Sequence, residues 1–148
     1  MRVKLRRWAQ VGLGLALAGL AGCQQSSSAD AAKETAAQLL AIPAANPRVY
    51  ESKQEKKAWR NPYLVLRADG VGLVDTPNNL IHLLKADDVP QALANLPLSQ
   101  WPDGRVVAIE EQGKDAPEPL RVQIRKNRAI LLGELETLHV AVSWMPPA

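Results

Sequence analysis

The stretch YLVLRADGVGLVD, from Tyr63 to Asp75, decides the fold of this 148-residue chain. Apolar residues on both sides of Asp69-Gly70 are typical of two strands joined by a tight turn. Asp-Gly pairs favour such turns because both residues tolerate the left-handed conformation that a short hairpin needs. The next apolar run, residues 79–84, fits a third strand. The sequence therefore predicts a β-hairpin that starts a sheet.

Downstream of the hairpin, the pattern predicts helices that alternate with single strands. A helix is expected over about residues 87–96, with Pro90 in its first turn. A turn at residues 101–104 leads into an apolar stretch at residues 105–109, which fits a buried strand. Residues 139–144 fit a final strand. The helix between these last two strands is less clearly marked.

Residues 119–138 carry two competing patterns. Leu120, Val122 and Ile124 alternate as in a strand, whereas the leucines and isoleucine at 120, 124, 131, 135 and 138 share one helical face. We prefer a helix. The predicted order is β-β-(β)-α-β-α-β, a small mixed sheet with helices packed on one face, which is an α+β fold.

This order, together with the hairpin at residues 68–70 and the DGRVVAI stretch at residues 103–109, resembles the periplasmic domain of ExbD/TolR-type biopolymer transport proteins. The resemblance covers residues 63–144 and concerns topology rather than a specific motif. It implies a shared domain type. Those proteins carry an amino-terminal transmembrane helix with a functional acidic residue, which this chain lacks at the matching place, so motor activity is not implied.

The first 23 residues read as an export signal with a lipid attachment site. Basic residues precede an apolar stretch that is shorter than the roughly 20 residues of a transmembrane helix. Leu20-Ala21-Gly22-Cys23 resembles the lipobox of bacterial lipoproteins. That resemblance implies cleavage before Cys23 and acylation of Cys23. An ordinary secretory signal is the alternative.

The residue after Cys23 bears on location. In the envelope sorting rule of such lipoproteins, Asp at this position favours retention in the inner membrane. The residue here is Gln24, so the resemblance implies the outer membrane, facing the periplasm. Each buried methylene of an acyl chain contributes about 0.8 kcal/mol. The first expected partner is therefore membrane lipid, through acylated Cys23.

Three parts are expected along the chain: a signal peptide at 1–22, a lipidated cysteine with a polar tether and short helices at 23–61, and a small α+β domain at 62–146. The tether is QQSSSAD, residues 24–30. A short helix capped by Asp30 is expected to follow it.

A second short helix is expected in the same part of the chain. Ser52 and Glu55 fit a capping box, in which each side chain bonds a backbone N–H of the other residue. This helix would run to about Trp59. The basic residues between Arg48 and Arg60 fit either a solvated linker or a contact with anionic lipid head groups.

Charge and cysteine content exclude two classes of function. Four of the 18 basic residues lie in the signal segment, which leaves 14 against 15 acidic residues. A nearly neutral mature chain has no general attraction for nucleic acid. Cys23 is the single cysteine, so neither an internal disulfide nor a thiolate zinc site is possible.

Few residues in the sequence are candidates for a catalytic or ligand-binding role. Neither His82 nor His139 has a nucleophile or a metal ligand at standard spacing. Asp87-Asp88 is interpreted as the acidic start of a helix. We therefore predict no catalytic, cofactor or metal residue. Trp101 and Trp144 are the candidate ligand contacts, with a place in the core as the alternative.

The sequence thus predicts a non-enzymatic envelope lipoprotein, an interaction module at the periplasmic face of the outer membrane. Its partner would be an envelope protein or cell-wall material, and not nucleic acid. The alternative is a periplasmic domain that binds a small ligand or a glycan. A third hypothesis is a hydrolase with His82 or His139 as the base.

Overall fold

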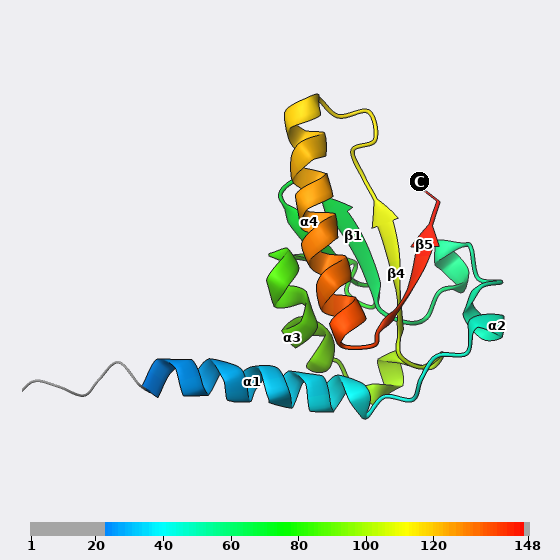
Figure 1. Ribbon diagram of the computed structural model, residues 1–148. Coiled ribbons are helices and arrows are strands. Elements are labelled where there is room, and N and C mark those ends of the chain that lie inside the picture. Colours follow the sequence, from blue (N-terminus) through cyan, green and yellow to red (C-terminus); the bar gives the residue numbers. More distant parts are fainter. Residues whose placement is uncertain (1–22, 147–148) are drawn as a thin grey trace, which may run out of the picture.

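A computed structural model describes residues 23–146, with side chains from Ser28 onward. A five-stranded sheet in the order β3-β2-β1-β4-β5 forms its centre. Figure 1 labels β1, β4 and β5 of this sheet, which lie side by side. The predicted α+β class is confirmed, and so is the third strand. The strands are β1 Tyr63–Arg67, β2 Gly70–Asp75, β3 Leu80–Leu84, β4 Val106–Glu111 and β5 Ala141–Met145.

The helices confirm most of the predicted order. The 3-10 turn Ala86–Asp88 leads into the expected helix after β3, and residues 120–125 are helical. Two further 3-10 turns span Lys56–Ala58 and Leu98–Gln100. The α-helices are α1 Cys23–Leu40, α2 Pro47–Tyr50, α3 Val89–Ala94 and α4 Glu118–Thr137.

The first hairpin forms as predicted, but its turn is one residue earlier. Arg67 pairs with Gly70, so Ala68 and Asp69 are the turn residues. The positive φ falls on Gly70, at 147°. A side chain there would collide with the carbonyl oxygen of Leu84. Glycine is therefore required where β2 begins, because β3 approaches it closely.

The sheet is mixed. β1, β2 and β3 form an antiparallel meander, whereas β1–β4 and β4–β5 are parallel pairs. Helix α4 connects β4 to β5 and covers one face of the sheet together with α3 (Figure 1). We call this the helical face. Its core is apolar, and ten of its side chains are fully buried: Leu39, Leu64, Leu66, Val71, Val89, Leu93, Val107, Ile109, Leu131 and Leu135.

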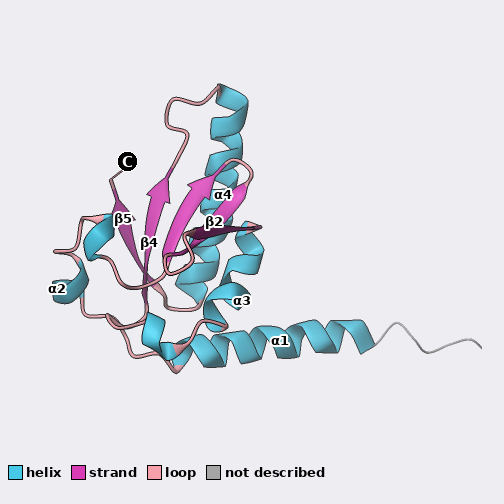
Figure 2. Ribbon diagram, turned by 180° about the vertical axis from the view of Figure 1, so that it is seen from behind, coloured by secondary structure: helices cyan, strands magenta, loops and turns pink. Residues whose placement is uncertain are grey.

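The opposite face, which Figure 2 shows from behind, has a different cover. Residues from the linker at 43–62 lie on it, so we call it the linker face. Its cluster is smaller and comprises Trp59, Tyr63, Val65, Val106, Ala108 and Met145.

Three expectations for the amino-terminal part are wrong. Residues 24–30 are not a tether outside the helices, because α1 starts at Cys23 and continues through them. Asp30 therefore lies inside α1 and does not cap a helix. The capping box at Ser52 and Glu55 does not form either. The helix there, α2, begins earlier, after Asn46, whose side chain accepts a hydrogen bond from the Arg48 N–H at 3.1 Å.

The expected signal peptide, residues 1–22, lies outside the described residues. Within residues 23–146, no helix is both long and apolar enough to cross a bilayer.

Candidate functional site

The two tryptophans predicted to contact a ligand lie in different surroundings. Trp101 is 4% exposed and packs in the core of the helical face. Its indole Nε1 is buried without a hydrogen bond, the one such side-chain atom among the described residues. Trp144 is 38% exposed on β5, and the Arg128 guanidinium lies 4.5 Å from its ring centroid. Trp101 thus lies in the core and also lines a hollow of about 270 Å³ beside residues 43–49, whereas Trp144 is partly exposed with Arg128 against its ring.

The two histidines also lie apart from each other. His82 is exposed on β3, with Nε2 3.8 Å from Asp75 Oδ2. Asn78 donates to Asp75 at 2.7 Å; this hydrogen bond, followed by the contact with His82, lowers the pKa of Asp75. His139 lies in the turn before β5 with a φ of 54°. The hydrogen bonds of the described chain join neither imidazole to a hydroxyl group, and no cluster of three metal-ligand residues occurs between residues 28 and 146.

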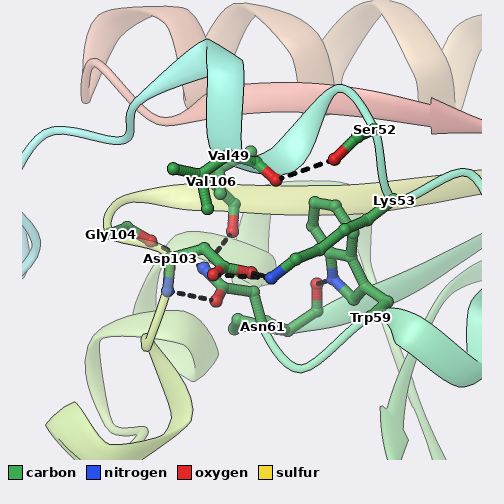
Figure 3. Close-up of polar contacts among 9 residues, drawn as sticks. Val49, Ser52, Lys53, Trp59, Asn61, Asp103, Gly104 and Val106 are labelled. Carbon is green, nitrogen blue, oxygen red and sulfur yellow. Dashed lines mark hydrogen bonds and ion pairs between the residues drawn. The ribbon is translucent and has the colours of Figure 1, made fainter.

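The polar residues at the entry to β4 form a buried group, shown in Figure 3. Asn61 donates to the carbonyls of Gly104 at 2.6 Å and Val106 at 2.9 Å. Its side-chain oxygen accepts from the Asp103 N–H at 2.9 Å. The Asp103 carboxylate, 8% exposed, pairs with Lys53 at 2.6 Å. Because each of these groups is already bonded within the chain, the cluster fixes the linker rather than offering a site.

A second buried carboxylate lies further along the linker face. Glu110 is 3% exposed, and Tyr63 donates its hydroxyl to Glu110 Oε2 at 2.7 Å. Lys56 Nζ lies 4.0 Å from the same carboxylate and 4.7 Å from the centroid of the Tyr63 ring. Burial, followed by this hydrogen bond to Glu110, raises the pKa of Tyr63. The group holds β1, β4 and the linker together and is closed to a substrate.

Arg105 joins α1 to the domain. Its Nε donates to the His139 carbonyl at 2.8 Å, and its Nη1 donates to the carbonyls of Leu39 and Ile42 at 3.2 Å each. These last two carbonyls lie at the carboxyl end of α1, where a helix has unbonded acceptors and attracts a cation.

Two further contacts hold the same half of α1. Leu39 is fully buried in the helical-face core, and the Thr35 hydroxyl donates to the Gln91 side chain on α3 at 2.5 Å. Residues 28–34 are exposed by contrast, and this half of α1 projects from the domain in Figure 1. The carboxyl-terminal half of α1 is thus an integral part of the fold.

The surface has a hollow of about 370 Å³ at one end of the sheet. The β1–β2 hairpin, the loop after β4 and the start of α4 surround it. Its wall is largely apolar. Arg67 and Asp69 also line it and pair with each other at 3.0 Å. Neither Trp101 nor Trp144 lines it.

An exposed apolar strand is the feature that sequence reasoning missed. Leu80, Ile81 and Leu83 of β3 are 53%, 53% and 50% exposed, and β3 is the outermost strand. The signal in the sequence was present: a run that is apolar at consecutive positions has a hydrophobic side chain on each face of its strand. Such a strand needs cover on both faces, and within the described residues β3 keeps exposed side chains on both, with Leu80 on one face and Ile81 and Leu83 on the other.

Comparison with known proteins adds no relative to this description: no family model, no curated protein and no solved structure matches the chain.

Proposed function

We propose that this protein is a non-enzymatic lipoprotein of the bacterial envelope. Acylated Cys23 would attach it to the outer membrane, and its domain would act from the periplasmic face as an interaction module for another envelope protein or for cell-wall material. The resemblance of residues 20–23 to a lipobox supports the anchor, and Gln24 supports the outer membrane.

One observation supports this proposal: α1 runs from Cys23, the residue at which we propose the lipid, into the core of the domain. It begins at Cys23 and has 18 residues, which corresponds to about 27 Å at 1.5 Å per residue. Its far end is bound by Leu39 and Arg105. A lipid on Cys23 would thus hold the domain at a defined distance from the bilayer. Defined spacing suits a protein that must meet a partner on a neighbouring structure.

The distribution of polar and apolar groups supports a binding role over a catalytic one. The buried ionisable groups Asp103, Glu110 and Arg105 are each paired within the chain. Exposed apolar side chains occur on several elements, and β3 carries three of them within four residues: Leu80, Ile81 and Leu83. Exposed apolar edge strands are sites at which chains associate.

Fatty-acid labelling of the native chain and of Cys23→Ala tests the anchor, with Gln25→Ala as a control for change near the cleavage point. We expect label and membrane association in the native chain and in Gln25→Ala, and neither in Cys23→Ala. Gln24→Asp should move the protein to the inner membrane. An unlabelled native chain in the soluble fraction would overturn the proposal. If the labelling gives the expected result, cross-linking with mass spectrometry identifies the partners whose recovery depends on the anchor.

The hollow near the β1–β2 hairpin supports a second candidate, a small-ligand domain. Its volume of about 370 Å³ falls at the lower end of the range for ligand pockets, roughly 300–1,000 Å³. Ala116→Trp would fill it. A ligand that raises the melting temperature of the native protein, and not that of Ala116→Trp, would favour this candidate.

A further inference from the structure

Strand β3 has one edge without a partner. β2 pairs with its inner edge over five residues, from Leu80 opposite Asp75 to Leu84 opposite Val71. β3 is last in the sheet order, so the N–H and C=O groups of its outer edge face away from the sheet. Edge strands are usually protected by charged side chains, proline or a bulge. Residues 80–84 contain none of these protections.

Both faces of β3 present apolar side chains. Ile81 and Leu83 lie on the linker face, opposite Val74 and Gly72, and both are half-exposed. A side-chain carbon on Gly72 would come within 2.6 Å of Ile81 Cγ2, so Ile81 leans inward over β2 and leaves the edge itself open. Leu80 is 53% exposed on the helical face. A single covering helix would bury only one of these faces.

The order of side chains is symmetric about His82. We propose that β3 pairs antiparallel with β3 of a second copy of this chain, around a two-fold axis at His82, to form one continuous ten-stranded sheet. Leu80 then lies opposite Leu84, Ile81 opposite Leu83, and His82 opposite His82 of the other copy. Each apolar side chain meets an apolar side chain, and the same patch serves both copies, as a two-fold interface requires.

Other registers fit less well. In a continuous sheet, residues that lie opposite each other on paired strands have their side chains on the same face. The alternative registers of the two β3 strands therefore differ from the proposed one by two residues. One of them places Leu80 opposite His82. The other places His82 opposite Leu84 and Ile81 opposite Lys85. The register centred on His82 is therefore the one that keeps polar and charged groups away from the leucines. It also keeps the two Lys85 residues at opposite ends of the paired strands.

This inference uses the exposed strand and does not rest on lipid at Cys23. The test uses the full-length protein under a mild oxidant, with the chain that carries only Cys23 as baseline. In His82→Cys the two new thiols are directly opposed, with Cα atoms about 4.5–5.5 Å apart, inside the disulfide range of roughly 4.4–6.8 Å. We expect a covalent dimer that forms at least about tenfold faster than the baseline.

Leu80→Cys is the matched control, because residue 80 lies on the same strand and is about as exposed as His82. In the proposed register, residue 80 of one copy lies opposite residue 84 of the other, so the two residues 80 are about 14 Å apart. Cross-linking of Leu80→Cys should therefore remain at the baseline rate. Mixing Ile81→Cys with Leu83→Cys should give a cross-linked pair. Adding Ile81→Lys to His82→Cys should abolish the dimer while circular dichroism stays unchanged.

Equal cross-linking at residues 80 and 82 would show random collision and overturn the proposal. A folded His82→Cys protein that does not cross-link would also overturn it. If His82→Cys in cells cross-links to a different protein in place of its own copy, a heterologous strand is the partner and the two-fold pairing is wrong. Each result is independent of fatty-acid labelling at Cys23, which tests the proposed function.

Discussion

The two faces of the sheet are covered by different means. On the helical face, α3 and α4 pack leucine and valine side chains against the strands, and the fully buried residues are all apolar. On the linker face, residues 43–62 contain only the short helix α2 and one 3-10 turn, and polar contacts with Asn61, Asp103 and Glu110 hold them in place. The helical face is thus stabilised mainly by the burial of apolar surface, and the linker face by specific hydrogen bonds and ion pairs.

This difference has consequences for stability. Truncation of a buried apolar side chain lowers the free energy of unfolding in proportion to the volume removed. Removal of one partner of a buried polar contact lowers it because the other partner is left unbonded. We therefore expect larger effects from truncation on the helical face than from removal of a polar side chain on the linker face. We also expect effects on the linker face to depend on pH or to remain local.

Truncation of a core leucine on α4 should have the largest effect. Leu135 is fully buried, so Leu135→Ala should lower the free energy of unfolding by about 2–5 kcal/mol. Leu120→Ala is the control, since Leu120 is on the same helix and 48% exposed; its cost should be about 0.5 kcal/mol or less. Urea denaturation measures both. Equal costs at the two positions would mean that α4 does not cover the main core.

Removal of the Asn61 side chain should come next. Asn61→Ala leaves the carbonyls of Gly104 and Val106 and the Asp103 N–H without these bonds. A buried polar group left unbonded costs about 1–3 kcal/mol. The loss should be local as well as global: hydrogen exchange should accelerate in residues 43–62 and remain slow in α4. Uniform acceleration across both regions would contradict a separate role for the linker.

Tyr63→Phe should have an effect no larger than that of Asn61→Ala, and this effect should depend on pH. The variant leaves the buried Glu110 carboxylate without its Tyr63 hydrogen bond, with Lys56 4.0 Å away, which costs about 1–3 kcal/mol at neutral pH. Burial and this bond raise the pKa of Tyr63 above its ordinary value of 10.0. Above pH 10 the unfolded chain releases the phenolic proton while the folded chain keeps it, so the native protein loses stability as pH rises.

Phenylalanine has no proton to lose, so the difference between Tyr63→Phe and the native protein should shrink above pH 10. Urea midpoints at pH 7 and pH 11 measure it. A difference that stays constant between the two pH values would show that Tyr63 titrates normally in the folded protein.

The same contrast explains which parts of the fold could be predicted. The helical face depends on periodicity, and the spacing of Leu131, Leu135 and Leu138 indicated a helix at residues 119–138 before the structure placed it there. The hairpin was predictable from Asp69-Gly70, although the turn itself is one residue earlier. Local patterns therefore identified the elements whose partners are close in sequence.

The linker face could not be predicted in this way. Asn61 bonds residues more than 40 positions away, and Gly104 is required because residues 43–45 pass within 2.9 Å of where its side chain would start. Such contacts have no periodic signature. The burial of Trp101 could not be decided from the sequence for the same reason, since it depends on elements that pack on Trp101 from elsewhere in the chain.

The smallest expected effect comes from a polar group that resembles the Asn61 cluster but is exposed. Asp75 pairs with Asn78 and His82 much as Asp103 pairs with Asn61 and Lys53, yet it lies at the open end of β2. The Asn78 hydrogen bond, then His82, lowers the pKa of Asp75 below 3.8. Its contribution to stability is therefore present above that pH and lost as pH falls through the lowered pKa. Asp75→Asn should shift the urea midpoint at pH 7 less than Asn61→Ala, and the shift should shrink as pH falls below 3.8. An effect as large as that of Asn61→Ala would mean that bonding, and not burial, sets the energy of these clusters.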